Sequence, residues 1–303
     1  MNMRQTIFTH VRFIVRSKVA GLLRRELTYE VSPGWRIQIP PEHKLPLLQK
    51  VHPTYDRYFL KFFAKVSEQS PNFVIVDVGA NVGDTAVAVR SVAPAAEIIC
   101  VEGSQHFLKY LMKNLGSDAH VRVVPSFVSV GGGRFEFSRG GGTGRLETIG
   151  QAQPSTRETS DSEIDFVEPA EVVRMLHGDS LAVWKSDTDG HDVAILLKGY
   201  DEIVQRCDVL WFEMQMLGRW SDHHESISTL FEKLAELDRE IMLFDNFGRL
   251  MFRATTALAP RVVPQLQRWV SEQTEAGDLA VNYFDVWVMP AGLANTFEGS
   301  LRD

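Results

Sequence analysis

Cysteine and long apolar runs are both scarce in this chain. Two cysteines occur among 303 residues, Cys100 and Cys207, and both fall at or just before expected buried strands. No Cys-x-x-Cys spacing exists, which argues against a catalytic or metal-binding thiol. So few cysteines favour a reducing compartment, and we expect a cytoplasmic protein. No run of about eighteen apolar residues appears, so the sequence offers no candidate membrane span.

Positive charge is also in short supply. The chain has 32 Lys and Arg against 39 Asp and Glu, a net charge of -7. Proteins that bind nucleic acid broadly usually show a basic domain, so we expect no nucleic-acid partner. The hydrophobic fraction of 44% is ordinary for a globular protein with a sizeable core. The length suits one large α/β domain with appendages, or two smaller domains.

The N-terminus departs from this acidic average. Residues 1–28 hold six Lys and Arg against one acid, Glu26, with apolar residues at rough helical spacing among them. An uninterrupted apolar segment and a small-residue cleavage site are both missing, so a secretory signal is not expected. We interpret the segment as a basic helix that packs on the core or mediates a homodimer. A peripheral contact with an anionic membrane stays open as the alternative.

The most informative stretch runs from residue 74 to residue 102. It opens with a short β-branched run, as expected for a buried parallel strand. Gly79 and Gly83 follow, four residues apart around Asn81, where the backbone must turn sharply and approach a ligand. Glu102 lies about twenty residues further on, roughly where nucleotide-binding α/β folds place an acid against ribose hydroxyls. The pattern indicates a ligand that contains a nucleoside.

The charges of this loop distinguish between nucleoside ligands. The dinucleotide fingerprint has a second glycine where this chain has Asn81. Asp77 and Asp84 stand at the two ends of the loop, where they would repel a pyrophosphate and attract a cation. S-adenosylmethionine (SAM) carries an ammonium and a sulfonium and no phosphate. The pattern therefore favours SAM over NAD, and an NAD-linked oxidoreductase becomes the weaker alternative.

Three segments resemble one family. Residues 77–84 resemble motif I of class I SAM-dependent methyltransferases. Residues 184–199 resemble the lysine-x-aspartate-x-glutamate-glycine segment of the FkbM-type methyltransferases, and residues 209–213 the strand ending in Glu that follows it. The segments come in the family's order within residues 55–290.

The resemblance implies a fold and a domain organisation. It implies a Rossmann-like class I methyltransferase fold, a mostly parallel seven-stranded sheet with a reversed edge strand and helices on both faces. We expect a basic helical segment and cap over 1–70, the methyltransferase domain over 71–290 and a tail over 291–303. The family usually has Glu where this chain has Asp189 and Asp192, each shorter by one methylene.

Apolar periodicity predicts elements that alternate along the chain. Strands are expected at 73–78, 97–101, 120–125, 134–138, 181–185, 209–212, 240–244, 249–253 and 283–289. Helices are expected at 55–66, 85–92, 107–115, 168–177, 192–197, 225–237 and 262–270. Residues 139–163 are rich in Gly, Ser and Thr and poor in large apolar residues, so we expect a mobile loop or substrate lid there.

Ligands of open α/β sheets gather at the carboxyl ends of the strands, which selects the candidate binding residues. For the cofactor these are Asp77, Gly79, Asn81, Gly83, Asp84, Glu102, Gly103, Ser104 and Ser126. In this class a helix before the first strand often covers the cofactor site. The candidates for acceptor binding are Tyr55, Arg57, Glu213 and Asn246.

Methyl transfer from a sulfonium is an in-line displacement at carbon, and a hydroxyl acceptor must also lose a proton. The candidate catalytic residues are Asp187, His191 and Lys185. His191 has the near-neutral unperturbed pKa that suits a base, and Asp187 could instead take the proton or orient the hydroxyl. A calcium loop built on Asp187 fails, because Lys185 and Leu196 would occupy ligand positions. Mg²⁺ stays open but is not favoured, so metal ligands are left unknown.

The sequence thus predicts a cytoplasmic SAM-dependent O-methyltransferase, with a membrane-associated location as the alternative. The resemblance implies the acceptor, a hydroxyl on a sugar, a glycan or a small natural product. A methyltransferase-like scaffold that binds a partner without catalysis is the alternative from another class.

Overall fold

The computed structural model describes residues 26–130, 135–140, 143–148, 165–216, 224–277 and 281–302, and for 135–140 and 143–148 it describes the backbone alone. The basic helix expected at 1–28 therefore lies almost wholly outside the described residues, as does most of the expected lid at 139–163. In the described part, no helix combines the length and the apolar character needed to cross a membrane.

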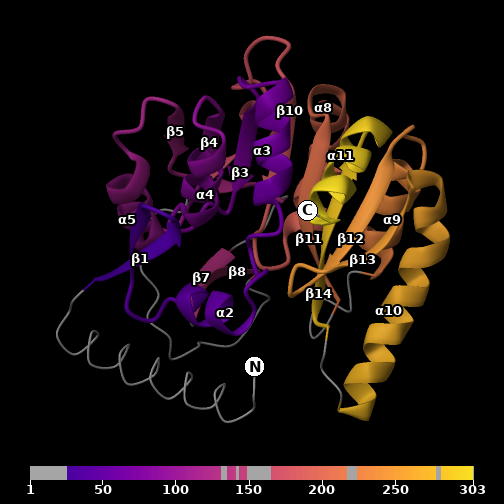
Figure 1. The fold of residues 1–303 in the computed structure, drawn as a ribbon. Coiled ribbons are helices and arrows are strands. Elements are labelled where there is room, and N and C mark those ends of the chain that lie inside the picture. Colours follow the sequence, from indigo (N-terminus) through magenta and orange to yellow (C-terminus); the bar gives the residue numbers. More distant parts are fainter. Residues whose placement is uncertain are drawn as a thin grey trace.

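A single large sheet organises the described residues (Figure 1). Its eight strands lie in the order β13-β12-β14-β11-β10-β3-β4-β5. Their bounds are β3 Val74–Val78, β4 Glu97–Val101, β5 Val121–Val124, β10 Ala182–Ser186, β11 Val209–Gln215, β12 Glu240–Asp245, β13 Leu250–Thr255 and β14 Tyr283–Met289. β14 runs antiparallel to β11 and β12, and the edge strand β13 runs antiparallel to β12. The doubly wound, mostly parallel sheet with a reversed edge strand is confirmed, with one strand more than expected.

Residues 26–70, the described part of the N-terminal segment, combine a hairpin with two helices. β1 (Leu27–Ser32) and β2 (Trp35–Ile39) form an antiparallel hairpin, and Gly34 supplies its turn with φ +80°. The helices α2 (Leu45–Val51) and α3 (Leu60–Gln69) follow. Ile37 and Ile39 are buried in the same core as residues of the main sheet. The described part of 1–70 therefore completes the sheet's own core and is no separate unit.

Two further segments differ from expectation. Residues expected as a C-terminal tail form α11 (Ala291–Arg302), whose Phe297 is fully buried against Phe62 and Trp287. Sequence periodicity missed this helix because it contains Gly292 and Gly299 and few large apolar residues. The glycine-rich region from 139 is also not wholly irregular. β7 (Phe135–Gly140) pairs antiparallel with β8 (Thr143–Thr148), and Gly140 and Gly144 lie at the turn end of that hairpin.

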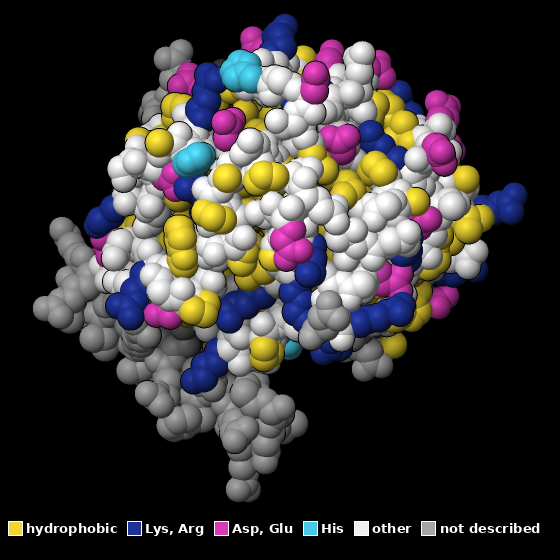
Figure 2. Space-filling model, turned by 45° about the horizontal axis from the view of Figure 1, so that its top comes forward, with side chains coloured by type: hydrophobic (Ala, Val, Ile, Leu, Met, Phe, Trp, Pro, Cys, Tyr) yellow, Lys and Arg dark blue, Asp and Glu magenta, His cyan; other side chains and the backbone are white. Residues whose placement is uncertain are grey.

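Acidic and basic side chains are interspersed over the outer face that Figure 2 shows, among the residues described there. Surface charges of mixed sign cancel one another beyond about 10 Å at ordinary ionic strength. The net negative charge of the chain is therefore no guide to where a ligand binds, and the buried charges have to be considered separately.

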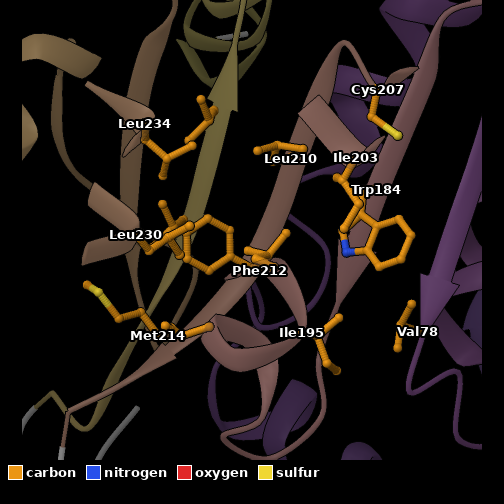
Figure 3. Close-up of a cluster of buried hydrophobic side chains, with 14 of the residues drawn as sticks. Val78, Trp184, Ile195, Ile203, Cys207, Leu210, Phe212, Met214, Leu230 and Leu234 are labelled. Atoms are coloured by element: carbon orange, nitrogen blue, oxygen red, sulfur yellow. The ribbon is translucent and has the colours of Figure 1, made fainter. Parts of the chain in front are cut away.

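The interior consists of two apolar cores, one on each face of the sheet. All five residues of β3 are buried, and alternate side chains enter opposite cores, with Val76 on one face and Ile75 on the other. The first core packs against α6 (Pro169–Val173), α7 (Asp192–Lys198), α8 (Tyr200–Arg206), α9 (His224–Leu234) and α10 (Ala259–Ala276). Figure 3 shows Trp184, Phe212 and Leu230 among its side chains.

The second core packs against α2, α3, α11 and the helices α4 (Asp84–Val92) and α5 (Gln105–Leu115). Both cysteines are free and buried, Cys100 within β4 and Cys207 just before β11. Because helices cover both faces of the sheet, the parallel strands are accessible mainly at their ends. Polar side chains that follow the carboxyl ends are therefore the ones that can meet a ligand.

Candidate functional site

Two pockets lie at the carboxyl ends of the parallel strands. Pocket A is formed by the segments after β3, β4, β5 and β10, and its lining includes Glu102, Gly103, Ser126, Phe127, Val128, His191 and Ile195. Pocket B is formed by the segments around α2, β10, β11 and β14, and its lining includes His43, Tyr55, Asp56, Asp84, Lys185, Glu213, Tyr283 and Asp285. Gly79, Asn81, Asp187 and Asp189 line both pockets. The two pockets therefore meet at these four residues.

The two glycines of the loop after β3 have different roles. Gly79 has φ +77°, and a Cβ there would lie 2.1 Å from the backbone carbonyl oxygen of Asp187. Only glycine allows this loop to cross so close to the segment after β10. Gly83 also has a positive φ, but a Cβ there would meet the δ-carbons of Leu111 and Leu115 at 2.8 Å. Gly83 lines neither pocket, so its packing against α5 accounts for that glycine.

Glu102 holds the loop from the neighbouring strand. The backbone N–H of Asn81 donates to its Oε2 at 2.8 Å, and the backbone N–H of Ser104 donates to its Oε1 at 2.7 Å. The side chain is nearly buried, and burial raises the pKa of Glu102 to about 7. Each carboxylate oxygen keeps a further lone pair, so Glu102 can also accept two hydroxyl groups from a ligand in pocket A.

The rest of pocket A is largely apolar. Phe127 lies against the backbone of Gly103, where a Cβ would come within 2.2 Å of the ring. Ser126, Val128 and Ile195 continue the wall. Ser104, another predicted cofactor residue, is buried beneath this wall, and its described contribution is the backbone hydrogen bond to Glu102. Pocket A thus combines a flat apolar surface with one buried acid.

Lys185 forms a buried ion pair at the base of the site. Its Nζ lies 2.8 Å from Oδ1 of Asp77 and 3.7 Å from Oδ2 of Asp187. Burial alone would lower the pKa of Lys185, but Asp77 and then Asp187 outweigh it and hold the pKa above the usual lysine value. Asp77 lines neither pocket, so it acts on the site through Lys185.

Asp187 has the central position. It lines both pockets, and its side chain is 52% exposed, whereas that of Lys185 is 4% exposed. His191 lines pocket A and stands just before the first residue of α7. Asp192 is buried within that first turn, where it accepts hydrogen bonds from the backbone N–H and the hydroxyl of Thr188. Burial, then the charge of Asp187, raises the pKa of Asp192 to about 6.

Pocket B concentrates acids. Six carboxyl groups line it, from Asp56, Asp84, Asp187, Asp189, Glu213 and Asp285. Burial, then the charge of Asp187, raises the pKa of Asp285 to about 8 and that of Glu213 well above its usual value. Burial likewise raises the pKa of Asp56 and of Asp84. Carboxylates crowded in this way repel one another, which destabilises the charged forms.

Backbone strain is concentrated in the same place. Asp56, Asn81 and Asp189, with φ of 48°, 51° and 54°, are the non-glycine residues of the described part that have positive φ. All three line pocket B. Such conformations are costly and cluster at functional sites. The turn at Asp56 also explains why α3 begins at Leu60 instead of near residue 55.

The four residues expected to bind the acceptor divide into two groups. Tyr55 and Glu213 line pocket B. Arg57 instead donates hydrogen bonds to the side chains of Gln49 and Tyr29, and it lines neither pocket. Asn246 also lines neither pocket, and its Oδ1 accepts a hydrogen bond from the backbone N–H of Asn282. The contacts of Arg57 and Asn246 are structural.

Sequence reasoning missed His43, Tyr283 and Asp285. His43 lies 3.4 Å from Oδ1 of Asn81 through its Nε2, and its Nδ1 accepts a hydrogen bond from the backbone N–H of Leu45. Burial, as the largest cause, lowers the pKa of His43, so its neutral form supports Asn81. These residues come from both ends of the chain, and no local motif marks them. Within the described residues, no group of three or more His, Cys, Asp or Glu side chains is placed to hold a metal ion.

No family model and no curated protein matches this sequence. Solved structures do resemble its fold at low identity. A METTL16 MTase domain aligns at 9% identity and a TM-score of 0.43, over 85% of this chain and 73% of that chain. The O-methyltransferase TomG from Streptomyces achromogenes, in complex with SAM, aligns at 10% identity and a TM-score of 0.41, over 77% and 79%. At these values the likeness carries no inference about activity.

Proposed function

We propose that this chain is a SAM-dependent methyltransferase, similar to the FkbM type, that methylates a hydroxyl on a sugar, a glycan or a small natural product. The observation that carries the proposal is the junction of the two pockets at Asp187. A methyl donor in pocket A and an acceptor in pocket B would meet there. Methyl transfer needs that arrangement, because the nucleophile, the methyl carbon and the sulfur must lie in line.

The residues of pocket A fit this donor. Glu102 has lone pairs for the two ribose hydroxyls, and Phe127, Val128 and Ile195 offer an apolar wall to the adenine. Asp187 and Asp189 offer negative charge to the ammonium and the sulfonium. Neither Lys nor Arg is among the described residues that line pocket A, so a pyrophosphate would meet acids without a cation to balance it. The pocket therefore favours SAM over a dinucleotide.

When bound, the donor supplies an electrophilic methyl group on a sulfonium. Asp187 orients the acceptor hydroxyl and takes its proton as the new carbon–oxygen bond forms. The Nζ of Lys185 lies 3.7 Å from Oδ2 of Asp187, and Lys185 is itself kept in place by Asp77. His191 lines pocket A alone, so in this proposal it acts on the donor side and Asp187 is the base.

Calorimetry with S-adenosylhomocysteine, SAM and NADH tests the donor. We expect both adenosyl compounds to bind and the affinity to fall at least tenfold in Glu102→Ala, because the ribose and the loop at Asn81 lose their acceptor. Glu68→Gln is the control, since it removes an exposed acid on α3. Binding of NADH alone, or equal affinities in wild type and Glu102→Ala, would overturn the proposal.

A further inference from the structure

Glu213 and Asp285 are directly opposite one another in the sheet. β11 and β14 are antiparallel, and the two residues are paired in their register. Side chains at such positions lie about 5 Å apart on the same face, and like charges there destabilise the pair. Glu213 is 8% exposed, so water offers it little screening. Because burial and the charge of Asp187 raise the pKa of both acids, a cation bound between them would stabilise their charged forms.

The hydrogen bonds of this pair leave an acceptor open. Oε1 of Glu213 accepts from the side-chain amide of Gln215, while the described residues provide no hydrogen bond to Oε2. Asp285 is hydrogen-bonded by the hydroxyl of Tyr58, which in turn accepts from the indole N–H of Trp287 at 3.0 Å. Glu213 lines pocket B and is 8% exposed, so its Oε2 can accept a hydrogen bond from a bound ligand.

The two lysines that line pocket B are either already paired or exposed to solvent. Lys185 lies 2.8 Å from Asp77, and Lys44, the other lysine of the lining, is exposed to solvent. A metal ion is disfavoured, because the described acids are not grouped as a set of metal ligands. An ammonium group suits the site better, since it has three N–H donors and can bridge two carboxylates.

We propose that the acceptor molecule carries a protonated amine that binds between Glu213 and Asp285 while its hydroxyl lies at Asp187. The proposal rests on the proposed function, which places the acceptor in pocket B. It assigns the acceptor to amine-bearing hydroxyl compounds, such as an amino sugar or an aminated natural product. Asp56, on the same pocket lining, offers that amine a further carboxyl group.

The spacing of the strands supports this assignment. Ser186 on β10 is in register with Phe212 on β11, so Asp187, the residue after β10, is next to Glu213 within β11. Adjacent strands lie about 4.8 Å apart. The reactive hydroxyl and the ammonium would then be separated by about the width of a sugar ring, and one small molecule can reach both.

Two matched pairs of probes test the proposal by calorimetry at pH 7.5. The first pair is 6-amino-6-deoxyglucose and glucose, and the second is tyramine and 4-(2-hydroxyethyl)phenol. Within each pair, the first compound has an amine where the second has a hydroxyl. Each is titrated into the full chain, alone and with S-adenosylhomocysteine. We expect the amine to bind at least tenfold more tightly than its partner in at least one pair. Glu213→Gln combined with Asp285→Asn should abolish that preference and change the affinity for S-adenosylhomocysteine less than twofold.

Glu97→Gln is the matched control, because it removes an exposed acid at the opposite end of a strand. If the double variant does not fold, Glu213→Gln alone replaces it. Equal binding within both pairs, no binding of any probe, or an amine preference that survives the substitutions would overturn the proposal. So would tight binding of Mg²⁺ alone that the same substitutions abolish. Failure to bind S-adenosylhomocysteine would instead count against the proposed function, since the probes are also titrated without it.

Discussion

Pocket A and pocket B share four residues but are built in different ways. Pocket A comes mainly from one continuous stretch, residues 78–130, joined by residues 187–195. Pocket B draws its lining from residues 43 to 285, across most of the described chain. Pocket A is apolar with one buried acid, whereas pocket B is crowded with acids. The lining of pocket A is therefore mostly local in the sequence, whereas the lining of pocket B is assembled by the fold.

The strongest test of the difference between the two pockets is to remove the side chain of Asp187, where they meet. We expect Asp187→Ala to lower kcat about 10² to 10⁴-fold, the usual contribution of a positioned acid–base group, while S-adenosylhomocysteine still binds. A methyl-transfer assay with an accepted substrate and calorimetry measure the two effects. Full activity in Asp187→Ala would show that the pockets do not meet functionally at this residue.

The ion pair beneath the junction should matter more for stability than any surface pair. Lys185→Met leaves Asp77 buried without its partner, so we expect the free energy of unfolding to fall by about 3 to 5 kcal/mol. Urea denaturation measures it. Lys65→Met, which removes an exposed pair with Glu68, should cost less than about 1 kcal/mol. Similar losses in the two variants would contradict the buried pair's role.

Lowering the pH should weaken binding in pocket A, because Glu102 takes up a proton. The pKa of Glu102 is raised to about 7, so Glu102 gains a proton as the pH falls through that value. The protonated form accepts fewer hydrogen bonds, and affinity for S-adenosylhomocysteine should fall about tenfold per pH unit below pH 7. Calorimetry from pH 5.5 to 8.5 checks this. Glu102→Gln should flatten the profile, and an unchanged slope in that variant would assign the titration to another group.

Metal removal should have the smallest effect. Because the described acids are not grouped as metal ligands, we expect EDTA to leave both donor affinity and turnover within about twofold. Enzyme assays before and after dialysis against EDTA measure this. Activity that is lost and then restored by Mg²⁺ would show that the acids of pocket B hold a cation during turnover.

Sequence patterns predicted those features that depend on a few neighbouring residues. Strands β4 and β14 have the bounds that periodicity predicted, because short runs rich in β-branched and aromatic residues are typical of strands. The segment from Gly79 to Glu102 was also recognised, since its glycine and its acid occur at a characteristic spacing. Ser126 and Asp187 follow the carboxyl ends of β5 and β10, Glu213 lies within β11, and each of the three lines a pocket.

Long-range contacts were not predictable from pattern. Arg57 and Asn246 looked like ligand residues by type, yet their side chains bind Gln49 and the backbone of Asn282. Asp285 gave no signal, because it occupies an alternate position in a strand. Only the pairing of β14 with β11 brings Asp285 to Glu213.

The sequence by itself determined the sheet's parallel strands, the turn at Gly79 and the acid that supports it, because steric limits and apolar periodicity act over a few residues. The tertiary structure decided that two pockets meet at Asp187 and that six carboxyl groups face one cavity. Those features depend on strand order, and strand order follows from how two cores are packed across the whole sheet. The selectivity of the site is therefore a property of the folded chain.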